Sequence, residues 1–150
     1  RRAFGNTEKA FPTPMNNPSD SPFNYTEAFI ALGTSNFDRS VQFYRQLLQQ
    51  EPNPYLAAVY AEFRLINLKL CLFCPKESHR EEFSDSRGSG MSICFEVESL
   101  EKAIEHWSEI GYGARGEISQ ASHGPEIYIY DPDGNRLIFH QSTAKTNPFR

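Results

Sequence analysis

Three features are scarce in this 150-residue sequence: cysteine, long apolar runs and excess positive charge. Three cysteines cannot all pair within one chain, so the cysteine count favours a reducing compartment, and we expect the cytoplasm. No apolar run approaches the length of a membrane span, and no basic segment followed by an apolar one opens the chain. The net charge of −4 provides no basic face for a nucleic-acid backbone. We therefore expect neither nucleic acid nor membrane as a partner.

The composition, 39% hydrophobic and 23% charged, is typical of one globular domain. Residues 1–25 are rich in Pro, Asn and Ser and show no apolar period, which predicts a flexible N-terminal arm. Residues 75–90 are charged and end in glycine, which indicates a solvated linker, and residues 143–150 resemble the arm. A domain over 26–142 remains, made of two blocks at 26–74 and 91–141. Because the chain opens on Arg1, the sequence leaves open whether a targeting segment preceded it.

The two blocks repeat each other without gaps. The stretch FIALGTSNFDRSVQFYRQLL from Phe29 aligns with SICFEVESLEKAIEHWSEIG from Ser92, an offset of 92 − 29 = 63 residues. Each copy starts with alternating apolar residues and continues with apolar residues at helical spacing, so each predicts a strand followed by a helix. Asn36 and Ser99 are the expected N-caps, and Gly111 is the expected C-terminal cap of the second helix.

Further strand-like runs follow each predicted helix. They are LAAVY with AEFRL and LKLCLFC in the first block, and GARGEISQ, EIYIYD and RLIFHQ in the second. Each block therefore reads as a βαββ unit with an extra strand, and a unit that cannot cover its own sheet is expected to pair with its copy. The side chains expected to pack under the helices are Ile30, Leu32, Phe63, Leu65, Ile93, Phe95, Val97, Ile127, Ile129, Leu137 and Phe139.

Three motifs in these blocks resemble a known family. The stretches SNFDRSVQFYRQLL, YAEFRLINLKLCLF and above all YDPDGNRLIFHQ are similar to the vicinal oxygen chelate superfamily, which includes glyoxalase I, ring-cleaving dioxygenases and bleomycin resistance proteins. The resemblance spans residues 28–141. It implies an α+β fold of two βαβββ modules in tandem, whose curved sheets form a cleft, and it implies a homodimer. The superfamily's enzymes generally hold a divalent metal there, through His or an equivalent on each first strand and Glu or Gln on each last strand.

The metal ligands of that family do not carry over to this sequence. The first-strand positions hold Phe29 and Ser92, and the last-strand position of the second module holds Ile138. The equivalent position in the first module falls on Leu70 or Cys71, depending on how the shorter turn is aligned. Phe, Ile and Leu have no lone pair to donate to a metal ion. We therefore expect no metal and no other cofactor.

Other chemical readings of these motifs have simpler alternatives. The DPDG stretch lacks the spacing and the Glu of a calcium loop, which favours a hairpin turn. Cys71 and Cys74 point to opposite faces of a strand and are expected to be core residues rather than a redox pair. Of the four histidines, His140 shares a face with Ile138. The others are expected to be surface or satisfied histidines: His79, His106 and His123.

Strand alternation also predicts which side chains line the cleft. The expected ligand-binding residues are Phe29, Tyr60, Glu62, Ser92, Glu96, Glu126, Tyr128, Tyr130, Arg136, Ile138 and His140. Aromatic walls with a few carboxylates and arginines suit an organic ligand. In the alternative, Glu62 pairs with Arg64 or Arg136 and the cleft is filled by its own side chains.

Two classes of function follow, together with a weaker third. The first is a metal-free protein that binds a small organic molecule, similar to bleomycin resistance proteins. The second is a lyase, isomerase or dioxygenase of the same superfamily. Such an enzyme would use Glu96, Glu126 or His140 as a base, or would hold a metal through an unusual set of these residues. The third is a docking subunit that acts through residues 1–25. No catalytic residue is assigned from the sequence.

Overall fold

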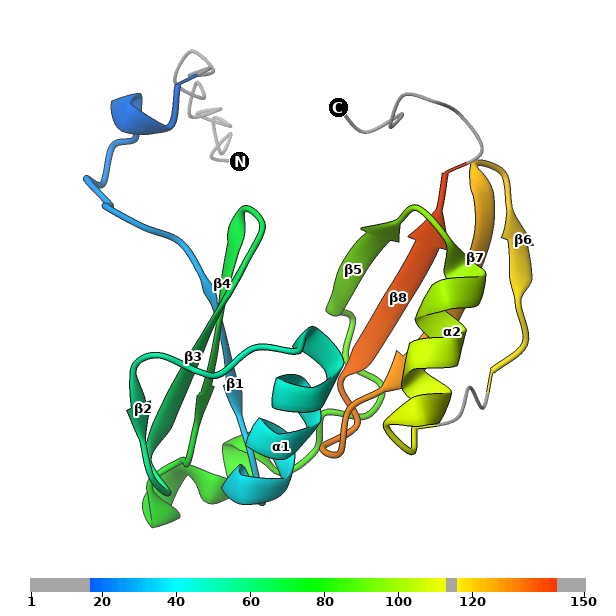
Figure 1. Ribbon diagram of the computed structural model, residues 1–150. Helices are drawn as coiled ribbons and strands as arrows, with labels where there is room; N and C mark the ends of the chain where they lie inside the picture. Colours follow the sequence, from blue (N-terminus) through cyan, green and yellow to red (C-terminus); the bar gives the residue numbers. More distant parts are fainter. Residues whose placement is uncertain (1–16, 113–115, 143–150) are drawn as a thin grey trace, which may run out of the picture.

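The structure is a computed structural model that describes residues 17–112 and 116–142. Most of the predicted arm, at 1–16, and the predicted tail, at 143–150, lie outside the described residues. The described chain forms two four-stranded sheets with one α-helix packed on each (Figure 1).

The first module contains one helix and four strands. They are β1 (Ile30–Gly33), α1 (Phe37–Leu48), β2 (Tyr55–Leu56), β3 (Tyr60–Leu65) and β4 (Leu68–Phe73). The sheet order is β1-β4-β3-β2, with β1 parallel to β4 and β3 antiparallel to it. The side chain of Asn36 accepts a hydrogen bond from the backbone N–H of Arg39, which confirms the predicted N-cap.

The second module repeats this arrangement. It contains β5 (Ser92–Val97), α2 (Leu100–Glu109), β6 (Ser119–Ala121), β7 (Gly124–Tyr130) and β8 (Arg136–Gln141), in the order β5-β8-β7-β6. Ser99 caps α2 by accepting from the backbone N–H of Lys102, and Gly111 follows the helix with a φ of +87°. The predicted α+β fold of two βαβββ modules in tandem is confirmed, and neither sheet closes into a barrel.

Two short 3-10 helices lie outside the modules and were not predicted. The first, η1 (Pro18–Asp20), lies in the exposed segment before β1. The second, η2 (Glu77–Phe83), lies in the segment between the modules, where the charged composition indicated only a linker. Its Phe83 ring packs edge-on against Phe73 at 5.1 Å, and a Cβ on Gly33 would lie only 2.8 Å from that ring. One aromatic residue therefore anchors the connecting segment to the first module.

The core lies on the helix side of both sheets. Tyr44 of α1 and Trp107 of α2 are fully buried, and Trp107 packs edge-on against Phe139 at 4.5 Å. Every side chain that alternation placed under the helices belongs to this core or packs against it. The sequence-based prediction of which strand face is covered is therefore confirmed.

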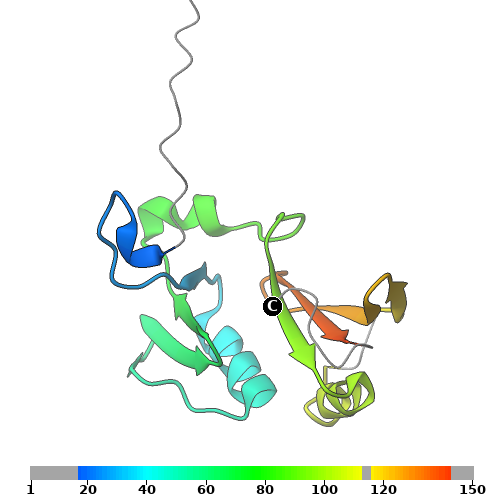
Figure 2. The ribbon, with the colours of Figure 1, turned by 90° about the horizontal axis from the view of Figure 1, so that it is seen from above.

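The modules contact each other through their helices and through the turn between β7 and β8. Phe43 of α1 packs edge-on against Tyr112, with ring centres 4.7 Å apart. His106 Nε2 lies 3.1 Å from the carbonyl oxygen of Gln46. Two side chains of α1, Tyr44 and Ser40, also donate hydrogen bonds to the turn at 131–135. Helix α1 lies between the two sheets, and the two uncovered faces do not face each other (Figure 2).

Candidate functional site

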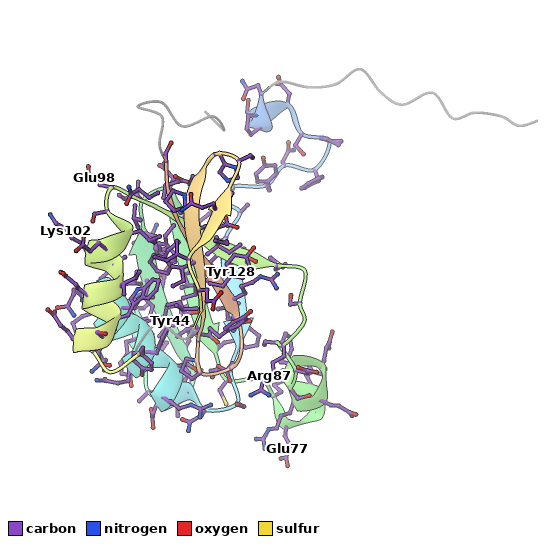
Figure 3. All side chains as sticks on the ribbon, turned by 90° about the vertical axis from the view of Figure 1, so that its right-hand side faces the viewer. Tyr44, Glu77, Arg87, Glu98, Lys102 and Tyr128 are labelled. Carbon is purple, nitrogen blue, oxygen red and sulfur yellow. The ribbon has the colours of Figure 1, made fainter. Side chains whose placement is uncertain are left out.

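The uncovered faces of the two sheets carry the residues that the sequence predicted to bind a ligand. We call them the module 1 open face (Phe29, Ala31, Tyr60, Glu62, Arg64, Lys69, Cys71) and the module 2 open face (Ser92, Cys94, Glu96, Glu126, Tyr128, Tyr130, Arg136, Ile138, His140). Tyr128 points from β7 away from α2, as Figure 3 shows. The structure therefore groups the predicted site residues into two sets, and within one chain it does not bring Phe29 to Ile138.

The register of the strands decides which residue of module 1 corresponds to Ile138. Ile138 pairs with Cys94, and the residue 63 positions before Cys94 is Ala31. Ala31 pairs with Cys71, whereas Leu70 pairs with Ile30 and points into the core. Cys71 is therefore the equivalent of Ile138, and the alternative Leu70 is wrong because its side chain lies on the covered face.

Cys71 is a buried thiol that is already engaged. Its Sγ lies 2.9 Å from the hydroxyl oxygen of Tyr60, and Glu62 is its neighbour on β3. The hydrogen bond with Cys71, together with burial, raises the pKa of Tyr60 to about 12. Tyr60 therefore keeps its proton at neutral pH and presents no ionised oxygen on this part of the face.

A lysine that was not among the predicted ligand-binding residues lies over Phe29, at the first-strand position of module 1. The Nζ of Lys69 is 4.2 Å from the centre of the Phe29 ring, 2.7 Å from Glu27 and 3.2 Å from Glu62. The hydrogen bond with Glu27 raises the pKa of Lys69, and the same bond lowers the pKa of Glu27. Both groups stay charged at neutral pH. Lys69 precedes Cys71 by two residues on β4, so strand alternation places both on this face, and the signal was present in the sequence.

The equivalent position in module 2 also carries a cation. Lys69 precedes Cys71 by two residues, as Arg136 precedes Ile138. The Nε of Arg136 donates to the hydroxyl of Ser92 at 2.7 Å, and its terminal nitrogen donates to the carbonyl oxygen of Ser89 at 2.8 Å. In both modules, therefore, a cationic side chain contacts the residue at the predicted first-strand metal position.

Cys94, Ile138 and Tyr128 are neighbours across three strands and form the central row of the module 2 open face, which is largely uncharged. Ile138 is half-buried between Cys94 and Tyr128, and Tyr128 and Tyr130 are exposed. Burial, followed by the charges of nearby carboxylates, raises the pKa of the Cys94 thiol. Cys94 is therefore protonated at neutral pH. This row offers aromatic and apolar contacts rather than ionic ones.

The next row contains the three ionisable residues that the sequence named as possible bases. Glu96, His140 and Glu126 are direct neighbours across β5, β8 and β7. Both carboxylate oxygens of Glu96 lie within 2.9 Å of His140 Nδ1. Glu126 lies on the other side of His140, and the Tyr128 hydroxyl donates to its carboxylate at 3.4 Å. Sequence alternation correctly grouped these residues but did not predict that His140 is buried.

The DPDG turn has a second role that was not predicted. Asp131 accepts hydrogen bonds from the Tyr44 hydroxyl at 2.7 Å and from the Asn135 side chain at 2.8 Å. Asp133 accepts from the hydroxyls of Ser40 at 2.7 Å and Ser35 at 2.9 Å. Burial alone would raise the pKa of Asp133, but these hydroxyl donors outweigh it and lower that pKa. The turn is a hairpin turn, as expected, and it also fastens module 2 to α1.

A large hollow lies beside the C-terminal half of β7. Its volume is about 1160 Å³, and its lining includes Arg39, Arg87, Tyr112, Tyr128 and Tyr130. It contains two of the predicted ligand-binding residues, both tyrosines of the module 2 open face. The remaining predicted residues lie outside this hollow.

Over residues 17–112 and 116–142, no group of three or more His, Cys, Asp or Glu side chains is arranged to hold a metal ion. In the same part of the chain, no helix has the length and apolarity needed to cross a bilayer.

Comparison with known proteins identifies the family. A family model described as the Glyoxalase/Bleomycin resistance protein/Dioxygenase superfamily matches residues 27–139. The chain belongs to this superfamily. The match covers both modules, so the predicted family is confirmed. A comparison with curated proteins finds no match.

Several solved structures of this superfamily share the fold. A glyoxalase/bleomycin resistance protein from Catenulispora acidiphila is 22% identical, with a TM-score of 0.59, over 78% of this chain and 98% of that one. A lactoylglutathione lyase from Agrobacterium tumefaciens is 19% identical, with a TM-score of 0.59, over 78% and 94%. A bleomycin-binding protein complexed with bleomycin is 19% identical, with a TM-score of 0.56, over 79% and 99%. At these identities the likeness concerns the fold.

The metal that the superfamily's enzymes generally hold does not fit the residues of this chain. Phe29 and Ile138 have no donor atom, and the Cys71 thiol is shared with Tyr60. The Ser92 hydroxyl accepts from Arg136, and the Lys69 ammonium lies over Phe29. A second cation at either place would be repelled by the side-chain cation.

Proposed function

We propose that the protein binds a small organic molecule on its open faces and uses no metal at the superfamily's ligand positions. The observation that carries this proposal is the pair of side-chain cations, Lys69 and Arg136, at the two first-strand positions. A similar fold that binds an organic molecule supports it, namely the bleomycin-binding protein complexed with bleomycin. Three free cysteines in the described residues agree with a reducing compartment, and we propose the cytoplasm.

The exposed side chains of module 2 suggest the chemistry of the ligand. Tyr128 and Tyr130 offer aromatic surface, and Ile138 offers an apolar contact between the strands. Arg39 and Arg87 line the hollow beside these tyrosines and provide donors for an anionic group. An aromatic compound with a carboxylate or sulfonate group is therefore the ligand class that these residues favour.

We propose that the functional form is a homodimer. Each open face leaves large apolar side chains in solvent, among them Phe29 at 47% exposure and Tyr128 at 41%. A second copy that brings a module 1 open face opposite a module 2 open face would form the cleft that one chain does not form. Sedimentation equilibrium tests this proposal, and a monomer at every concentration would contradict it.

Ligand binding can be tested with anilinonaphthalene sulfonate, a fluorescent aromatic anion. We expect saturable binding that Ile138→Glu weakens by about 5- to 150-fold, since a carboxylate in the apolar row costs about 1–3 kcal/mol. Ile66→Glu is the matched control, because Ile66 is 92% exposed on the turn between β3 and β4. Equal binding by the two variants would show that the dye does not use this face.

The metal-free part of the proposal is tested by elemental analysis and a chelator. We expect less than stoichiometric Zn, Ni, Mn or Fe in the purified protein, and an unchanged melting temperature after chelation. One tightly held ion per chain would contradict the assignment of Lys69 and Arg136 as the cations of these sites.

An enzymatic function is the second candidate, and one observation favours it. Glu96 holds the imidazole of His140 in a fixed orientation, which is the arrangement of an oriented general base. The lactoylglutathione lyase among the similar structures shows that the fold also occurs in an enzyme.

A further inference from the structure

His140 is a buried histidine. One of its ring nitrogens contacts a carboxylate, and the other has no hydrogen-bond partner within the described residues. Its side chain is 5% exposed, and its Nδ1 lies 2.8 and 2.9 Å from the two carboxylate oxygens of Glu96. An ionised carboxylate only accepts hydrogen bonds, so Nδ1 carries a proton. Within the described chain, His140 Nε2 is the buried side-chain nitrogen without a hydrogen-bond partner. In the neutral ring, Nε2 therefore carries an unused lone pair.

The turn between β6 and β7 covers this lone pair. The His123 ring lies over His140, with ring centres 4.4 Å apart. The backbone of Gly124 lies beside Nε2. A Cβ at this position would lie 3.2 Å from that nitrogen and would collide with the carbonyl of Gln141. The turn is attached through β6, an edge strand that pairs with β7 over three residues. A short edge strand can open locally at small cost in free energy.

We propose that the Glu96–His140 pair is a general base that takes a proton from a small carbon acid or phenol bound on the module 2 open face. This inference rests on the proposed ligand-binding function. The apolar row of Cys94, Ile138 and Tyr128, directly beside the base, would contact the body of the substrate. A buried polar atom left without a partner costs folding free energy, so a role in chemistry gives a reason for its retention.

The proposed proton transfer needs no other reactant. The proton leaves the C–H or O–H of the substrate for His140 Nε2, and its electron pair stays on the substrate anion. The Nδ1–H bond of His140 stays donated to Glu96, whose carboxylate stabilises the imidazolium that forms. Return of the proton to a different atom of the anion completes an isomerisation and restores the neutral ring. Glu126 from β7 and His123 from the turn are the other ionisable groups around the ring.

The activity can be tested with 5-nitrobenzisoxazole, a small aromatic carbon acid. Removal of its C–H proton breaks the N–O bond and releases a coloured phenolate. We expect the protein to accelerate this reaction above an equal concentration of free imidazole, with a rate that rises with pH. His140→Gln should reduce the rate to that of buffer. Glu96→Gln should lower it about tenfold or more by releasing the ring. His123→Ala, which uncovers Nε2, should raise it.

His106→Gln is the matched control, because His106 lies on α2 and contacts backbone carbonyls of α1. Its rate should equal that of the wild type. An unchanged rate in His140→Gln, or no acceleration by either the wild type or His123→Ala, would overturn the proposal. Should His140→Gln fail to melt cooperatively, Glu96→Gln and His123→Ala decide the matter, since opposite changes in rate are expected. Dye binding without proton transfer would overturn this inference alone and leave the proposed binding function intact.

Discussion

Replacement of Tyr44 by phenylalanine should weaken the attachment of module 2 to α1. The Tyr44 hydroxyl donates a 2.7 Å hydrogen bond to Asp131, and both side chains are buried. Phenylalanine keeps the ring contacts with Phe43 and Phe63 and removes only the hydroxyl. Asp131 would keep the bonds from Asn135 and from the backbone N–H of Asp133. The lost interaction is therefore one hydrogen bond to a charged group.

Such a bond contributes about 1.5–3 kcal/mol to the free energy of unfolding. For a chain of this size, each 1 kcal/mol shifts the melting temperature by about 2–4 °C, so we expect Tyr44→Phe to melt about 3–12 °C below the wild type. Tyr60→Phe is the control, because its hydroxyl bonds a thiol rather than a carboxylate. That loss should cost about 1 kcal/mol or less.

The pH dependence gives this prediction a second, independent test. Burial, and then the charge of Asp131, raises the pKa of Tyr44 well above its usual value of 10.0. Tyr44 therefore keeps its proton in the folded protein above pH 10 but loses it in the unfolded chain. The stability that it contributes is complete below pH 10 and is lost as the pH rises further. The wild type and Tyr44→Phe should converge above pH 10 in urea titrations. Equal melting temperatures at pH 7, or a constant difference up to pH 11, would refute this account.

Three further outcomes are expected. Asp133→Asn should lower stability by about 1–2 kcal/mol at pH 7. Because the folded-state pKa of Asp133 is lowered, the difference should vanish as the pH falls below about 3.8 in acid titrations. Lys69→Met should return the pKa of Glu27 toward its usual value, measured by carboxyl NMR, and an unchanged pKa would contradict the ion pair. A chain that starts after Tyr25 should keep its cooperative melt, and loss of that melt would show that the preceding segment is structural.

Strand and helix periodicity predicted much of this fold because each signal is local. The repeat at 63 residues gave both modules, and alternation along β7 and β8 gave the face of Ile127, Ile129 and Leu137 that packs under α2. The N-cap at Asn36 follows from one side chain and the helix that it precedes. Such features need no knowledge of the other module.

The placement of the two modules could not be predicted from the same signals. Alternation states which face of a sheet is apolar, but it does not state whether two open faces meet within one chain. The contacts that fix this placement join Asp131 and Asp133 to Tyr44 and Ser40, over more than 85 residues. These four side chains are ordinary turn and helix residues in the sequence. Nothing in their local pattern shows that they are partners.

The site was partly predicted for a related reason. Alternation correctly placed Glu96, Glu126 and His140 on one face, because a face depends on parity alone. The burial of His140 depends on the turn that carries His123, and sequence spacing does not show how that turn folds back.

The side-chain cations over Phe29 and Ser92 have a consequence for regulation. A metal ion exchanges with its surroundings, so a metalloprotein responds to metal supply and to chelators. Lys69 and Arg136 are covalent parts of the chain, and their charge is independent of metal supply. Acetylation could neutralise Lys69, whereas methylation of Arg136 would keep its charge. A covalent modification could therefore remove the charge of Lys69 over Phe29, but not the charge of Arg136 at Ser92, although the two positions are equivalent in this duplicated fold.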